Sequence, residues 1–126
     1  MNVSGRRRRA LADTVRPAEV LRAYLGAELR GAMKARDTVA VATIRSLLSA
    51  LDNAGAVIET PAHAPVFGRS GDVPRRELTA ADIEQVLAAE AEERRVAADG
   101  YERRGRRDDA ARLRAELAFI AKLARA

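Results

Sequence analysis

A helix is predicted most clearly over residues 78–101, LTAADIEQVLAAEAEERRVAADGY. Thr79 suits the N-cap position and Asp82 stands three residues on, a short form of the capping box in which side chains accept hydrogen bonds from the first free backbone N–H groups. Apolar residues then recur every three or four places, the period of one helix face. They are Ile83, Val86, Leu87, Ala91, Ala97, Ala98 and Tyr101. We expect this face to be buried and the helix to end at Gly105.

Three further segments show the same period. Pro17 suits the first position of one helix, and Asp37 is a good N-cap for the next, which ends near Gly55. Asp108 or Asp109 can start the last helix, since negative charge favours a helix N-terminus. Their apolar stripes contain Leu21, Leu25, Leu29 and Met33, then Ile44, Leu47, Leu48 and Leu51, then Leu113, Leu117, Ile120 and Leu123. The predicted fold class is all-α, a bundle of four antiparallel helices with one long loop between the second and third.

Two stretches lack the helical period. Residues 1–16 hold five arginines and one aspartate, so we predict a flexible basic arm before a helical domain over residues 17–126. Residues 59–76 hold three of the four prolines and form the long loop. That loop contains His63, the sole histidine. It has no carboxylate pair nearby, so we expect neither a metal nor a catalytic role for it.

The composition limits the classes of protein to which the chain can belong. The chain has 126 residues, enough for one domain, and aromatic residues make up only 3 %, so the core must be aliphatic. It has no cysteine, which excludes disulfides and thiolate metal sites. The longest apolar runs fall short of a membrane span. We expect a cytoplasmic protein without a membrane or a metal as partner. The net charge of +5 favours nucleic acid as a partner.

No catalytic or cofactor-binding motif is recognisable, neither a phosphate-binding glycine loop with its lysine nor a nucleophile elbow. The densest basic cluster within the helical domain is Arg103, Arg104, Arg106 and Arg107. At a helix–helix corner these side chains either contact a phosphate backbone or form a solvated turn. Tyr101 is the one aromatic residue beside them, so base stacking of the kind that single-strand binders use is not expected.

Three charged residues lie near the apolar stripes of different helices: Arg45, Glu90 and Glu116. We predict that they form a semi-buried ion-pair cluster inside the bundle. Such a cluster serves either to fix the packing of the helices or to do chemistry, and the structural role is the more common one. Glu90 and Arg94 are also spaced as a surface i, i+4 pair.

Four motifs resemble the GatB/YqeY family in the right order. They are AMKARD at 32–37, TIRSLLSAL at 43–51, LTAADIEQVLAAEAEERR at 78–95, and YERRGR at 101–106 with RAEL at 114–117. The resemblance implies an α-helical domain related to part of the B subunit of the tRNA-dependent amidotransferase. Family members usually continue into a second, smaller helical part similar to a tRNA-contacting tail. We expect the present chain to match only the N-terminal helical part.

The resemblance implies a non-catalytic accessory protein that binds tRNA or associates with amidotransferase subunits. The family is grouped under carbon–nitrogen ligase activity with glutamine as amido-N-donor, but the chemistry of the complete enzyme belongs to other domains. We therefore expect no activity of the chain itself. The alternative is a protein-interaction or homo-oligomerising helical module without a nucleic-acid role.

Overall fold

Four helices make up the regular structure of the part described by the computed structural model, residues 16–56 and 76–125. They are α2 (Pro17–Ala35), α3 (Thr38–Gly55), α4 (Ala80–Arg103) and α5 (Arg107–Arg125). The all-α prediction is confirmed. The predicted basic arm, apart from Arg16, and nearly all of the predicted loop, including His63, lie outside these residues.

Local signals fix where the helices begin. Pro17 opens α2, and the Asp37 carboxylate accepts a hydrogen bond from the Ala40 N–H at 3.1 Å, as its N-cap position predicts. α3 ends at Gly55, whose carbonyl accepts a 2.8 Å hydrogen bond from the Arg76 N–H. This bond ties together the two chain segments on either side of residues 57–75. α5 begins at Arg107, one or two residues before the predicted aspartates.

The predicted capping box at the start of α4 is complete. The Asp82 N–H donates to the Thr79 hydroxyl at 3.1 Å, and the Thr79 N–H donates to the Asp82 carboxylate at 2.9 Å. The pKa of Asp82 is lowered from the usual 3.8, chiefly by the hydrogen bond from the Thr79 backbone. Because a hydrogen bond to the charged form favours that form, the carboxylate stabilises the folded state only while it is ionised.

This lowered pKa predicts a pH dependence of stability. The contribution of Asp82 is fully present above pH 3.8 and is lost as the pH falls through its lower folded-state pKa. Thermal unfolding of the wild type and of Asp82→Asn, followed by circular dichroism from pH 7 to pH 2, should show a gap in Tm that closes only in the most acidic part of the range. A gap of constant size at every pH would contradict the assignment.

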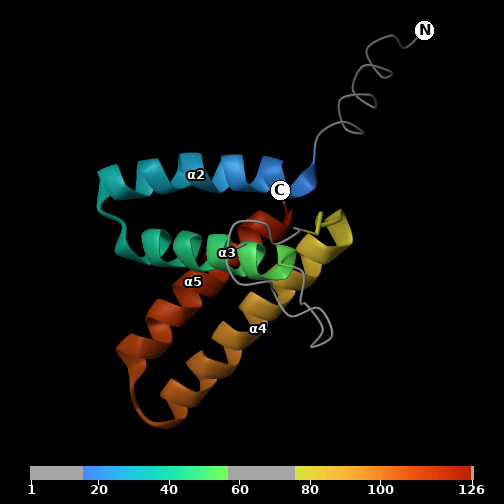
Figure 1. Cartoon of the computed structure of the whole chain (residues 1–126). Helices are drawn as coiled ribbons and strands as arrows, with labels where there is room; N and C mark the ends of the chain where they lie inside the picture. The colour runs from blue at the N-terminus through green and yellow to red at the C-terminus, as the bar shows by residue number, and fades with distance from the viewer. Residues whose placement is uncertain (1–15, 57–75, 126) are drawn as a thin grey trace, which may run out of the picture.

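The helices pair as two antiparallel hairpins. Figure 1 shows α2 and α3 side by side, with the hairpin of α4 and α5 crossing them obliquely. α3 and α4 each contact all three other helices, whereas no Cα atom of α2 lies within 8 Å of one in α5. The bundle is therefore open between α2 and α5.

The core is aliphatic, as the composition predicts. Its fully buried large side chains come from three helices and are Leu25, Ile44, Leu47, Leu51 and Ile120. Thr43 is buried among them, and its hydroxyl donates to the Val39 carbonyl at 2.7 Å, so this polar group is satisfied inside the core. α3 thus supplies most of the fully buried side chains of the core.

Two residues predicted on buried stripes are exposed. Met33 is 53 % exposed, and Ala97 is also exposed. Each is next in sequence to a buried alanine, Ala32 or Ala98, and one residue step turns a helix by about 100°. The buried face is therefore narrower than the predicted stripe.

Candidate nucleic-acid interface

The connection between α4 and α5 is a tight corner built around Gly105. The Gly105 N–H donates to the Glu102 carbonyl at 3.0 Å, and the Arg106 N–H donates to the Tyr101 carbonyl at 2.9 Å. These are the two hydrogen bonds of a Schellman motif. The motif needs a left-handed backbone conformation at the first of its two donor residues. Gly105 supplies it with φ 75°. The corner projects at the end of the α4–α5 hairpin farthest from α2 (Figure 1).

All four arginines predicted at this corner are exposed, but they are not equivalent. The Arg106 guanidinium lies 5.1 Å from the centre of the Tyr101 ring and pairs with the Asp109 carboxylate at 2.8 Å. Its charge is partly compensated, and its side chain covers the one aromatic ring nearby. Arg106 therefore belongs to the corner's own structure.

The other three arginines, Arg103, Arg104 and Arg107, are called here the corner triad. None of them forms an ion pair within residues 16–56 and 76–125. They flank Gly105 within five consecutive residues, so three guanidiniums without an ion pair in the described residues lie at one exposed turn. Such a group attracts an anion with closely spaced charges.

Arg114, about two helical turns after Arg107 on α5, already has ion-pair partners. Arg114 pairs with Asp99 at 3.2 Å and also with Glu102, both on α4. These hydrogen bonds, which Arg114 donates to the carboxylates of Glu102 first and then Asp99, raise the pKa of Arg114. They fasten the hairpin's two helices together next to the corner. The corner triad thus lies beside a basic side chain whose charge is already paired across the hairpin.

A second charged cluster is buried where α3, α4 and α5 meet. The Arg94 side chain is only 9 % exposed, and those of Glu90 and Glu116 are 15 % and 12 % exposed. Arg94 donates to the Glu116 carboxylate at 3.1 Å, to the Glu90 carbonyl at 3.0 Å and to the Ser46 hydroxyl at 3.0 Å. Ser46 in turn donates to the Glu90 carboxylate at 3.1 Å.

The cluster differs from the prediction in its cation. Glu90 and Glu116 are both present, but Arg45 is exposed and makes no ion pair in the described residues. Ser46, one residue on, faces α4 instead, because a single step rotates the side chain by about 100°. Arg94, predicted as a surface partner of Glu90, is the cation that joins the two carboxylates.

A signal for Arg94 was available in the sequence. Arg94 stands seven residues after Leu87 and four before Ala98, both buried, so it lies on the same helix face as they do. An arginine on an apolar stripe with a carboxylate four residues earlier indicates a buried pair. The partner on α5, by contrast, depends on how the helices cross.

Comparison with known protein families identifies the family of the chain. The Yqey-like protein family matches residues 22–124, which take in nearly all of the four helices. The chain belongs to the YqeY-like family. No curated protein and no solved structure matches it at a significant level. The corner triad and the Arg94 cluster both lie inside the matched part of this YqeY domain.

The described part of the YqeY domain offers no site for a metal ion, since no three histidine, cysteine, aspartate or glutamate side chains gather there. Nor does any of its helices have the length and apolar character to cross a membrane. Among the described residues, the carboxyl groups of Asp82 and Glu92 have shifted pKa values, and hydrogen bonds from Thr79 and Arg95 lower both. They stay ionised at neutral pH, which does not suit proton transfer.

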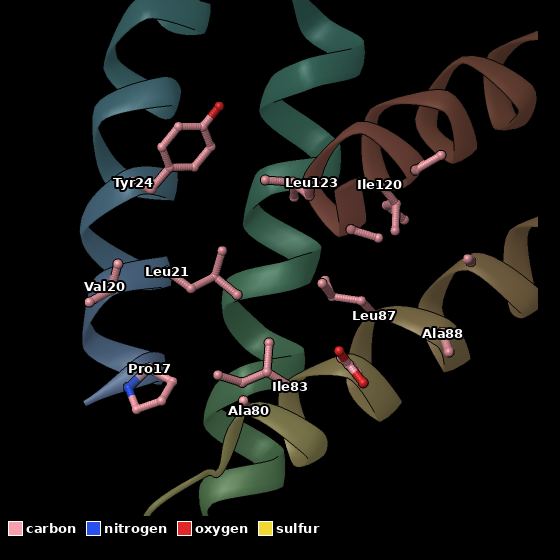
Figure 2. Close-up of a pocket in the computed structure, with 14 residues that line it drawn as sticks. Pro17, Val20, Leu21, Tyr24, Ala80, Ile83, Leu87, Ala88, Ile120 and Leu123 are labelled. Carbon is pink, nitrogen blue, oxygen red and sulfur yellow. The ribbon is translucent and has the colours of Figure 1, made fainter. Parts of the chain in front are cut away.

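The YqeY domain also has an apolar groove between α2 and α5, floored by α4. Its volume is about 790 Å³. Figure 2 shows Val20, Leu21 and Tyr24 along one wall and Ile120 and Leu123 along the opposite wall, with Ile83 and Leu87 of α4 between them. Val20 and Tyr24 are 51 % and 48 % exposed, so the groove is an open apolar surface. We call it the α2–α5 groove.

Proposed function

We propose that this YqeY-family protein is a non-catalytic RNA-binding accessory protein whose corner triad contacts a phosphate backbone. The observation that supports this is the set of three exposed guanidiniums, Arg103, Arg104 and Arg107, without ion-pair partners in the described residues. A guanidinium donates two parallel hydrogen bonds to a phosphate, so three of them on one turn suit adjacent phosphates.

The corner is suited to backbone contact, with little means of reading bases. Tyr101 is the one aromatic side chain there, and Arg106 covers its ring. Without a free stacking surface, recognition relies on the spacing of phosphates and the shape of a folded RNA. The resemblance to the B subunit of the tRNA-dependent amidotransferase supports tRNA as that RNA and the amidotransferase as the system served. The proposal assigns no bond-making step to this chain.

Binding of tRNA tests the proposal. In Arg103→Gln/Arg104→Gln/Arg107→Gln the charge is removed while a polar side chain with a similar helix preference is kept. We expect its Kd for tRNA at low salt to rise by about tenfold to hundredfold, since each exposed charged contact is worth up to about 1 kcal/mol. Fluorescence anisotropy with labelled tRNA measures this.

The matched control removes the same charge elsewhere. Arg30, Lys34 and Arg36 are exposed, lie near the end of α2 and form no ion pair in the described residues. Arg30→Gln/Lys34→Gln/Arg36→Gln should change the Kd by much less than the corner variant. Equal losses in both variants, or no binding by the wild type at low salt, would contradict the proposal.

A second candidate function is protein association, either with another protein such as an amidotransferase subunit or with a second copy of the chain. The α2–α5 groove favours it, because an open apolar surface on a small domain commonly marks a contact site. Light scattering during size-exclusion chromatography separates self-association from a monomer that awaits another partner.

A further inference from the structure

We propose that the α2–α5 groove binds one amphipathic α-helix of a partner protein, which carries a basic residue beside its apolar face. This inference deepens the second candidate function and is independent of RNA binding. The groove exists because α2 and α5 both pack on α3 while their own backbones stay apart. A bundle that is open between two helices leaves the space that one further helix would fill.

The size of the groove suits two to three turns of helix. On α4 the lining runs from Ala80 to Ala91, a length of roughly 16 Å at 1.5 Å per residue. On α2 it runs from Pro17 to Tyr24, roughly 10 Å. Apolar side chains at i, i+3 and i+7 of a docked helix span about the same distance.

The lining is uneven in a way that suits a helix backbone. Large side chains come from all three helices, whereas only α4 and α5 also contribute small ones. The small ones are Ala80, Ala88, Ala91, Ala121 and Ala124. Alanines allow a neighbouring helix axis to approach toward the short end of the usual 8–10 Å range, so the partner's own side chains can reach the floor.

Charge complementarity specifies the partner further. Glu84 is the one charged residue among those lining the groove, and it forms no ion pair in the described residues. Its carboxylate stands beside an apolar surface that a bound helix would shield from water. A lysine or arginine on the flank of that helix would neutralise it, whereas an acidic flank would be repelled.

The test uses a set of helix-stapled peptides of about 12 residues, with leucines at i, i+3 and i+7 and one lysine placed at each flanking position in turn. We expect at least one peptide to bind the full chain in fluorescence anisotropy. Replacing its lysine by glutamate should weaken binding by about tenfold, as expected for one partly shielded charge pair. Ala88→Glu, at an exposed position of the lining, should abolish binding.

A charge swap distinguishes charge-specific binding from nonspecific hydrophobic binding. Glu84→Lys should lose the lysine peptide and gain the glutamate peptide, whereas Glu93→Lys, an exposed and unpaired carboxylate of α4 outside the groove, should change neither. Circular dichroism of each variant confirms folding.

The inference is overturned if no peptide of the set binds, or if Glu84→Lys leaves the preference for the lysine peptide unchanged. It is also overturned if the groove proves to be closed by a dimer that Ala88→Glu dissociates.

Binding to this groove and to RNA can fail separately. The lining of α4 ends at Ala91, twelve residues before Arg103, which is roughly 18 Å along the helix. A groove variant that loses the peptide should keep its tRNA affinity, and a corner variant should keep its peptide affinity.

Discussion

Arg94→Ala is expected to lower the free energy of unfolding by about 3–5 kcal/mol. The substitution leaves Glu90 and Glu116, 15 % and 12 % exposed, without the cation that lies between them. It also leaves the Ser46 hydroxyl without one of its partners. Two largely buried carboxylates without their shared cation are costly, because nothing then offsets their loss of solvation. Urea denaturation at neutral pH measures the loss.

The neighbouring arginine provides the control. Arg95 pairs with Glu92 and Asp99, but its side chain is 52 % exposed, so Arg95→Ala should change the denaturation midpoint little. Arg94→Ala/Glu90→Gln/Glu116→Gln should recover part of the stability lost by Arg94→Ala, since no buried charge is then left unpaired. Equal losses for Arg94→Ala and Arg95→Ala would show that the buried cluster does not hold α3, α4 and α5 together.

Leu47→Ala is expected to cost about 2–5 kcal/mol. Leu47 is fully buried in α3, the helix that contacts all three others, so the substitution opens a cavity at the centre of the bundle. Chemical denaturation gives the change, and an unchanged slope with denaturant would show that the unfolded state is the same.

Val96→Ala is the matched control for this cavity. Val96 is 54 % exposed on α4, so removing its methyl groups should shift stability by no more than about 0.5 kcal/mol. If Leu47→Ala were as mild as Val96→Ala, the arrangement of the four helices around α3 would be wrong.

The sequence predicted those features that neighbouring residues determine. Pro17, Asp37 and the Thr79–Asp82 capping box set helix starts through contacts within one turn, and Gly105 ends α4 through its own backbone. The 3–4 spacing of leucines then gave the helix class. Each of these signals spans only a few residues, so no knowledge of tertiary packing was needed.

Features that depend on how helices cross were predicted less well. Glu90 and Glu116 were placed together, but the choice of Arg94 over Arg45 depends on which side of α3 faces α4. The α2–α5 groove was not predicted, because its existence depends on a pair of helices whose backbones stay apart. Neither a helix period nor a charge pattern reports the distance between two helices.

The corner triad shows the same division. Sequence spacing placed Arg103, Arg104, Arg106 and Arg107 at one turn, but it gave all four the same weight. The Schellman geometry puts Arg106 over Tyr101 and beside Asp109, which leaves the other three unpaired in the described part of the chain. The proposed interface therefore has three charges, a number that can be measured.

The salt dependence of tRNA binding tests this account most directly. The logarithm of the binding constant falls linearly with the logarithm of salt concentration, by about 0.7–0.9 for each phosphate that a protein neutralises. If the corner triad binds phosphates, Arg103→Gln/Arg104→Gln/Arg107→Gln should reduce the steepness of this plot by about 2–3 relative to wild type, and the α2 control variant should leave it nearly unchanged. A corner variant with the wild-type slope would show that these arginines do not contact the RNA backbone.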